Sequence, residues 1–284
     1  MLPKSCVQGR VTFPTILDCY VKNTMWPAAL YGSTLAVNAT KQCTMKKRII
    51  TISIIGLVSL TLLSTTWFES THKCPICNTD NQFQDVGSYG SYIYQWESKF
   101  QYIFWPLTDN PVVYSCKACH YSTYMWDFDS LDAAKIPLVK EYLKDKKLSV
   151  KTSDYLKVPI TERLEIAEGV YNVLGRDDDF WCRFNRVKGY HYAMSRNDSK
   201  ARDCRIKALE IAEKMRLNKD NEGRLKEILL ITGGMKYFLN QKDSAKNDFR
   251  LALSLTYKSN DNKPDRDANI NSYLDEVLSE YLKK

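Results

Sequence analysis

Two Cys-x-x-Cys pairs constrain the fold of this chain more than any other feature. Cys74 and Cys77 form the first pair, and Cys116 and Cys119 form the second. Such pairs can present four thiolates to one tetrahedral metal ion, and the intervening residues 78–115 are enough for a small β-structure. We therefore expect a zinc-ribbon-like module with zinc as its cofactor. Because four cysteines fill the coordination sphere, the expected site is structural and has no open position for catalysis.

The residues beside the cysteines fit this interpretation. Asn78 and His120 each follow a pair, where a metal-binding turn reverses, and both residue types tolerate left-handed backbone. A turn is predicted at 109–111 and a short strand at 112–114. Between the pairs, aromatic residues alternate with others, which predicts strands whose rings cover a sheet rather than form a binding platform. These residues are Tyr92, Tyr94, Trp96, Phe100, Tyr102 and Phe104.

The charge of the chain is unevenly distributed. The formal net charge is +8, but residues 69–130 contain three lysines and seven aspartates or glutamates. A phosphate backbone would find little attraction in this acidic module, so we do not expect nucleic acid as a partner. A nucleic-acid-binding ribbon remains the alternative for a cytoplasmic chain.

The N-terminal part contains a candidate membrane segment. Residues 49–68 carry no charge and follow the basic residues 46–48. A stretch of about 20 mostly apolar residues can span a bilayer as a helix. Because basic flanks stay in the cytoplasm, we expect a single-pass membrane protein whose C-terminal part is extracytoplasmic. The pattern also fits a secretory signal, whose cleavage would leave a secreted or periplasmic chain.

From residue 131 onward the pattern is helical. Helices are predicted over 131–143 and 160–174, and Gly175 should end the second. Small residues then recur 44 positions apart, which would let antiparallel helices pack closely, with a spacing that resembles tetratricopeptide repeats. The recurring residues are Gly189, Ala201, Ala208 and Leu209, matched by Gly233, Ala245, Ala252 and Leu253.

Stacked helical hairpins commonly expose a groove that binds a protein or peptide. We expect the first helix of each hairpin, around 183–196 and 226–240, to line it. The candidate partner-binding residues would make this surface basic and partly aromatic, suited to an acidic peptide or a C-terminal carboxylate. They are Arg186, Tyr190, Lys226 and Lys236.

In chain order, these motifs resemble a bacterial family of uncharacterised proteins classified only as a domain of unknown function. The resemblance covers residues 73–284 and rests on the split cysteine ribbon, the sequence Asn-Pro-x-x-Tyr at 110–114, Tyr121 and the tetratricopeptide-like helices. Asn78 and His120 stand where the family pattern would have Gly. The resemblance implies a metal-stabilised interaction protein and supplies no catalytic residues.

A thiol-disulfide redox protein is the main catalytic alternative, because Cys-x-x-Cys outside the cytoplasm can be a redox couple. That motif normally opens a helix, whereas both pairs here are expected at turns. His72, His120 and His191 are too few and too scattered for a triad. Three acids at 177–179 are expected to cap a helix rather than to bind metal. No phosphate-binding Gly-rich loop or nucleophile elbow occurs in the sequence.

The expected architecture is therefore α+β, with a small four-cysteine zinc ribbon followed by an all-α domain of helical hairpins. The expected function is a non-enzymatic, zinc-stabilised scaffold for protein–protein interaction, anchored in a membrane. The expected parts are a disordered or over-extended N-terminus at 1–44, an anchor or signal at 45–68, the ribbon at 69–130 and the helical domain at 131–284.

Overall fold

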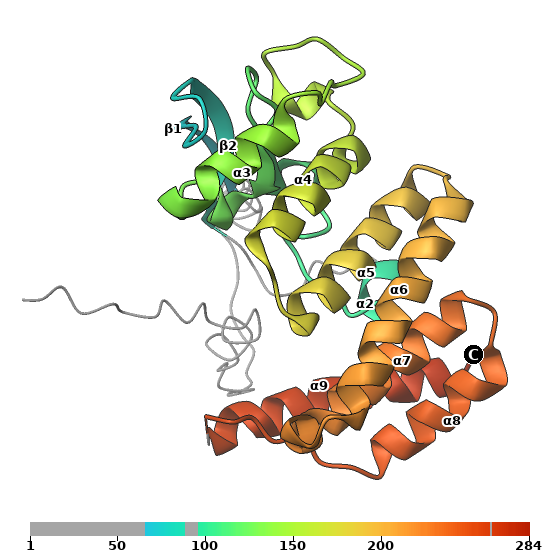
Figure 1. Ribbon diagram of the computed structural model, residues 1–284. Helices are drawn as coiled ribbons and strands as arrows, with labels where there is room; N and C mark the ends of the chain where they lie inside the picture. Colours follow the sequence, from blue (N-terminus) through green and yellow to red (C-terminus); the bar gives the residue numbers. More distant parts are fainter. Residues whose placement is uncertain (1–65, 89–95, 262) are drawn as a thin grey trace, which may run out of the picture.

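The computed structural model describes residues 66–88, 96–261 and 263–284, which form a mostly helical structure with two small antiparallel sheets (Figure 1). The expectations for residues 1–44, and for residues 45–65 of the candidate anchor, lie outside these residues. Residues 66–68 begin a β-strand, so the expectation of a membrane or signal helix reaching residue 68 is wrong at that end. Within the described ranges, every helix is too short or too polar to cross a membrane.

Each sheet is a hairpin with one cysteine pair in its connection. Strand β1 (Thr66–Lys73) pairs with β2 (Asp80–Ser88), and β3 (Val113–Ser115) pairs with β4 (Ser122–Tyr124). A short 3-10 helix, η3 (Asn110–Val112), precedes β3 where a turn was predicted. The predicted split of the ribbon into two halves is therefore present in the backbone.

From residue 96 onward, where the structure describes it, the aromatic stretch between the hairpins does not form the predicted strands. Residues 92 and 94 lie outside the described part, and helix α2 (Trp96–Phe100) follows. The chain then runs through 101–105 with every residue buried. The alternating aromatic residues predicted a strand with one buried and one exposed face. Both the aromatic residues and those between them are buried at 101–105, so this segment is not part of a sheet.

Further helices complete the described part of the chain. Helix α4 has the predicted bounds, and Gly175 ends it in the left-handed conformation with φ 72°. The helices are α3 (Ile136–Leu143), α4 (Ile160–Leu174), α5 (Asp178–Met194), α6 (Asp198–Leu217), α7 (Leu225–Phe238), α8 (Lys242–Leu253) and α9 (Pro264–Leu282). Short 3-10 turns are η4 (Met125–Asp127), η5 (Ala133–Lys135), η6 (Tyr155–Lys157) and η7 (Lys219–Arg224).

Helices α5 and α6 form one hairpin, α7 and α8 form another, and their turns repeat as well as their helices. Arg196 and Asn240, 44 positions apart, both have positive φ, of 58° and 65°. The amide after each of them donates to a carbonyl oxygen 2.9 Å away, that of Tyr192 in the first turn and of Lys236 in the second. The 44-residue repeat is thus a repeat of backbone geometry.

The recurring small residues lie where the helices of each hairpin meet, as predicted. A Cβ atom at Gly189 would be 3.3 Å from the carbonyl oxygen of Ala201, and one at Gly233 would be 2.3 Å from the ring of Phe249. The four recurring alanines, Ala201, Ala208, Ala245 and Ala252, are fully buried. Larger side chains at these positions would force the helices apart.

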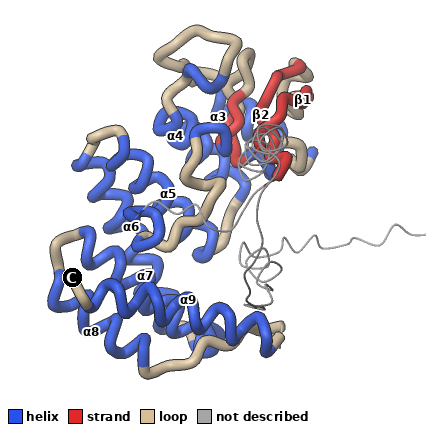
Figure 2. Tube along the Cα trace, turned by 180° about the vertical axis from the view of Figure 1, so that it is seen from behind, coloured by secondary structure: helices blue, strands red, loops and turns tan. Residues whose placement is uncertain are grey.

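The ribbon shares its core with the first helices. Phe83 and Tyr114 stack with ring centroids 4.1 Å apart, and the same cluster includes Val139 of α3 and Val170 of α4. Two short hairpins bury too little apolar surface to be stable alone, so helices from beyond residue 130 complete their core. Figure 2 shows the strands at one end of the molecule with α3 and α4, and the hairpins α5 to α8 with α9 at the other.

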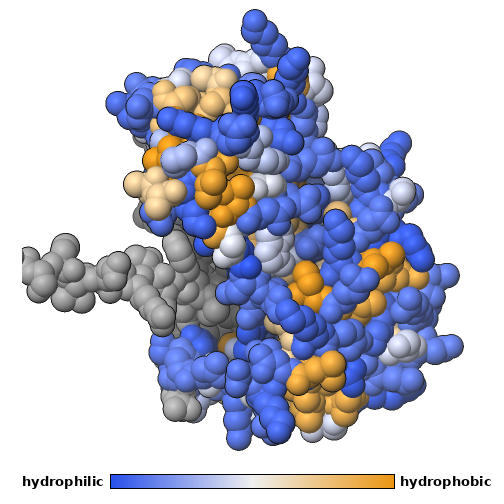
Figure 3. Space-filling model, viewed as in Figure 1, coloured by the Kyte–Doolittle hydropathy of each residue, from blue (hydrophilic) through white to orange (hydrophobic). Residues whose placement is uncertain are grey.

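The visible surface is mostly hydrophilic, with separate apolar patches (Figure 3). Large apolar side chains that remain exposed in the described part are Phe68, Leu138, Val150, Met194, Leu217 and Leu251. Scattered residues of this kind are ordinary for a folded chain and mark no site by themselves.

Candidate metal centre

Both cysteine pairs are held in turns with the same backbone hydrogen bonds. The amide of Asn78 donates to the carbonyl oxygen of Cys74, and that of His120 donates to Cys116, at 2.9 Å in each case. Asn78 and His120 have φ of 59° and 63°, which confirms the predicted left-handed conformation. Asn and His adopt this conformation more readily than most residues other than Gly, so both turns close without a glycine.

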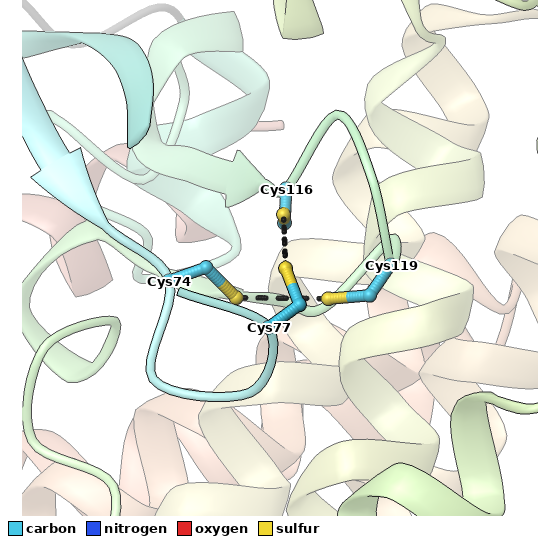
Figure 4. Close-up of side chains that lie close together, drawn as sticks. All are labelled: Cys74, Cys77, Cys116 and Cys119. Carbon is cyan, nitrogen blue, oxygen red and sulfur yellow. Dashed lines mark hydrogen bonds between the residues drawn. The ribbon is translucent and has the colours of Figure 1, made fainter. Parts of the chain in front are cut away.

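The two turns bring the four sulfur atoms together, as Figure 4 shows. All four lie within 4.8 Å of one another. The Sγ atoms of Cys74 and Cys119 are 3.6 Å apart and those of Cys77 and Cys116 are 3.5 Å apart, so both contacts join one pair to the other. Four sulfurs at about 2.3 Å from a tetrahedral zinc would lie about 3.8 Å apart. The cluster therefore fits one metal ion with four cysteine ligands.

The cluster has a buried side and an exposed side. Cys74 and Cys116 are fully buried, whereas Cys119 is half-buried and Cys77 is exposed. Hydrogen bonds from the thiols of Cys119 and Cys74 lower the pKa of Cys116, and the amide of Ala118 also points at its sulfur, at 3.5 Å. The hydrogen bond to Cys116 raises the pKa of Cys74 to about 12. The four thiols are thus close enough to influence one another's ionisation, and metal ligation requires the thiolate form.

Asn81 connects the two cysteine turns. Its side chain is buried, its Nδ2 donates to the carbonyl oxygen of Thr79 at 2.8 Å, and its Oδ1 accepts from the amide of Lys117 at 2.9 Å. The same Nδ2 lies 3.7 Å from the sulfur of Cys116. Sequence reasoning missed this residue, because an asparagine near the start of a strand carries no motif.

A second polar cluster lies beside the metal centre and was also missed. His72 contacts Ser70 through Nε2 at 2.8 Å and Asp129 through Nδ1 at 2.7 Å. This brings Ser, His and Asp together, although the histidines looked too scattered for a triad. Asp85, however, accepts from Ser70 at 2.5 Å and lies 3.1 Å from Nε2 of His72.

The electrostatics of this cluster do not suit a nucleophile. Partial burial acts to lower the pKa of His72, but hydrogen bonds to Asp129 and Asp85 outweigh it and raise the pKa. Both ring nitrogens of His72 face carboxylates, and the hydroxyl of Ser70 donates to Asp85, so Ser70 is not paired with a free base as a nucleophile would be. The arrangement instead ties β1 to β2 and to the loop after β4.

The candidate partner-binding residues do not form the expected open basic surface. Arg186, Tyr190 and Lys226 are 5%, 2% and 3% exposed. Lys226 pairs with Asp275 of α9, with Nζ and Oδ1 2.8 Å apart. Lys236 is nearly buried too and has two acidic partners on α6 and α8, each within 2.8 Å. These side chains belong to contacts inside the molecule. Arg186 contacts the segment before η3, Lys226 contacts α9, and Lys236 is held between α6 and α8.

Two other residues considered in the sequence analysis, His191 and Asp177, stabilise the fold. His191 is buried, which lowers its pKa to about 4, and its Nε2 donates to the carbonyl oxygen of Leu107 at 2.8 Å. Asp177 caps α5 as predicted, since its Oδ1 accepts from the amide of Phe180 at 2.8 Å. Among the described residues, the four cysteines form the group of three or more potential ligands whose ligand atoms all lie close enough together for one metal ion.

A protein-family model matches most of the chain. The model of a family described as "Uncharacterized protein conserved in bacteria (DUF2225)" matches residues 67–268, from the start of β1 into α9. No curated protein and no solved structure matches the chain.

Proposed function

The chain belongs to this uncharacterised family conserved in bacteria, and we propose that it is a non-enzymatic, zinc-stabilised scaffold for protein–protein interaction. The observation that carries the proposal is the convergence of four thiols from two turns of the same geometry. The family match supports the ribbon and most of the helical part as one inherited unit, because it spans both.

Zinc is the metal that the donor set favours. Four thiolates in a tetrahedral arrangement are typical of structural zinc, and iron–sulfur sites are the other common use of such a set. Zinc supplies no redox chemistry here; when bound, it links the two hairpins. Cys74 and Cys116 would hold it from the core, and Asn81 would keep the turns at the spacing that the ion requires.

The scaffold role is supported by the helical part. Two hairpins of repeated geometry, followed by α9, resemble a short tetratricopeptide-like array, and such arrays bind proteins or peptides rather than perform chemistry. This step is an analogy of fold, since repeated helical hairpins serve many partners. A protein or peptide is therefore the proposed partner.

The proposed location is a membrane surface. The uncharged run at 49–68 overlaps the first three residues of β1, so residues 49–65 would form the anchor, and the basic residues 46–48 would remain in the cytoplasm. The ribbon and helices would then be extracytoplasmic on a single-pass anchor, or secreted or periplasmic after cleavage. Protease added to the outer face of intact cells should digest the helical part if this topology holds, and leave it intact if the chain is cytoplasmic.

The metal assignment is tested on the purified full chain. We expect one zinc per chain, four-sulfur coordination by X-ray absorption, and loss of the ion in Cys116→Ser. The matched control is Cys204→Ser, which removes a buried thiol of α6 outside the cluster and should keep the zinc. A chain without metal that contains a disulfide within each pair would refute the proposal and favour thiol-disulfide chemistry.

A further inference from the structure

A segment from between the cysteine pairs crosses the C-terminal helices. We call residues 99–107 the inserted segment. It leaves the ribbon, begins at the end of α2, and packs against α5, α7 and α9, whose contacting surface we call the inner face. Figure 1 shows α2 drawn among these helices, far from the hairpin of β1 and β2. The segment thus lies where a tetratricopeptide-like array would bind a partner.

Side chains of the inner face bind backbone carbonyl groups of the inserted segment. Arg186 of α5 donates from Nη1 to the carbonyl oxygens of Gln101, at 3.1 Å, and of Tyr102, at 2.6 Å. Nε2 of His191 donates to Leu107 at 2.8 Å. The hydroxyl of Tyr281 on α9 donates to Phe100 in the same way. The segment itself is a series of turns, in which the amide of Ile103 donates to the carbonyl oxygen of Ser98 and that of Leu107 donates to Phe104, at 2.9 Å in each case. Side chains of the inner face thus bind the carbonyl groups of a compact segment in place of a strand or helix partner.

The N-terminal end of the inserted segment is held by charge. Nζ of Lys99 lies 2.8 Å from Oε1 of Glu276 and 2.7 Å from Oε1 of Glu280, both on α9. Partial burial acts to lower the pKa of Lys99, but hydrogen bonds to the two glutamates raise it, so the lysine stays charged. Close approach beside this anchor needs a glycine, because a Cβ atom at Gly234 would lie 2.8 Å from the carbonyl oxygen of Phe100.

Aromatic contacts complete the interface. The ring of Phe100 meets that of Tyr281 edge-on with centroids 4.2 Å apart. Phe104 and Tyr102 both contact Tyr273 of α9, with centroids 5.7 Å and 6.4 Å away. The inner face therefore contacts a lysine and three aromatic residues that lie one, three and five positions after it. They are Lys99, Phe100, Tyr102 and Phe104.

The inserted segment lies in the loop that the two cysteine pairs close. This loop comprises residues 78–115. A closed loop holds its middle near the helices at high effective concentration, and opening it lowers that concentration. This step rests on the proposed structural metal.

We propose that the inner face is a peptide-binding site occupied by the chain's own inserted segment, and that opening of the metal-closed loop frees it for a peptide of the same chemistry. The partner would carry a basic residue followed by alternating aromatic residues, in place of the acidic peptide expected from the sequence. The resident segment would act as a built-in competitor.

Charge reversal at the Lys99 anchor tests the site without touching the metal ligands. The probe is a fluorescent peptide with the sequence of residues 96–107, and the protein is the detergent-solubilised full chain. Metal-loaded wild type should not bind the probe. In Lys99→Glu, the new glutamate would face Glu276 and Glu280. This variant should exchange the amides of Gln101 and Ile103 about tenfold faster or more, and it should bind the probe. Wild type after chelation should bind as well, reversibly on adding zinc.

The controls separate this inference from the metal assignment. Lys144→Glu reverses a charge at an exposed pair with Glu141 and should behave as wild type. A probe with alanine in place of Phe100 and Tyr102 should not bind. Zinc content is measured on every sample, so a chain that binds zinc but never the probe refutes the peptide site alone. Unchanged exchange in Lys99→Glu, or a dimer that exchanges the segment between copies, would also overturn it.

Discussion

The matched glycines Gly189 and Gly233 allow a quantitative test of helix packing in the two hairpins. They stand 44 positions apart, and each faces the second helix of its hairpin. At Gly189 the nearest atoms to an added Cβ are 3.3 Å and 3.4 Å away, which is tight contact. At Gly233 they belong to the ring of Phe249, at 2.3 Å and 2.7 Å. Substitution by alanine therefore adds the same methyl group at a site with just enough room, Gly189, and at a site where a ring must move, Gly233.

The opposing effects can be estimated. Alanine is better than glycine in a helix interior by about 1 kcal/mol. At Gly189 the tight contact offsets part of this gain, so the free energy of unfolding should change by less than about 1 kcal/mol. At Gly233 the methyl group must displace Phe249, which stacks on Tyr281 with centroids 4.2 Å apart. Overpacking costs about 1–3 kcal/mol, so Gly233→Ala should lower the free energy of unfolding by up to about 2 kcal/mol.

Urea unfolding of the metal-loaded chain measures both variants, and thermal unfolding should show a drop of about 2–4 °C per kcal/mol at this chain size. Adding Phe249→Leu to Gly233→Ala should recover part of the loss, because the smaller side chain leaves room for the methyl group. Equal effects of the two alanines, or a stabilised Gly233→Ala, would show that the second hairpin is not packed as described.

Three further predictions concern the ribbon and a helix cap. Cys116→Ser should abolish metal binding and unfold the ribbon, since structural zinc can contribute on the order of 10 kcal/mol, while circular dichroism should retain most of the helical signal; a parallel loss of both signals would contradict this. Asn81→Ala should lower the free energy of unfolding by about 1–3 kcal/mol and speed the loss of zinc to a chelator. The control Gln82→Ala, at the exposed neighbouring residue, should change neither the stability nor the rate of zinc loss. Asp177→Ala removes the cap of α5 and should lower the free energy of unfolding by about 1 kcal/mol, and no change would place the cap elsewhere.

Features of the chain set by neighbours in sequence were predictable. The spacing within each cysteine pair, together with Asn78 and His120, determines a turn that closes through its own backbone. The end of α4 at Gly175 has the same local origin, because only backbone conformation matters there. The contact of Gly189 with the second helix of its hairpin was predictable from the 44-residue repeat of small residues. These are therefore the positions at which the sequence analysis and the structure agree.

Features set by distant residues were not predictable. Arg186 and Lys226 looked like surface residues because a sequence shows charge without its partner. The partners are backbone carbonyls 84 and 85 positions before Arg186, and Asp275 on a helix outside the repeat. The prediction of a strand in the inserted segment failed for a similar reason. Alternating aromatic residues indicate a strand only when one of its faces is buried and the other is exposed to solvent. Here residues 101–105 are all buried by distant parts of the chain, so the alternation does not indicate a strand.

The motif Asn-Pro-x-x-Tyr at 110–114 shows why the ribbon and the helices belong to one unit. Asn110 accepts a hydrogen bond from the guanidinium of Arg163, a fully buried residue of α4 that also donates to Val113. At the other end of the motif, Tyr114 donates to the carbonyl oxygen of Gln84 on β2 at 3.0 Å. Every acceptor in the Arg163 contacts is neutral, so burial lowers its pKa to about 10, and removing one acceptor would leave a costly unpaired donor. The motif therefore joins both hairpins to α4, immediately after the inserted segment returns to the ribbon. One end of that segment is fixed here, and the other end is fixed by the ion pairs of Lys99 with Glu276 and Glu280 of α9. The helical part is therefore linked to the ribbon through the loop that the four cysteines close.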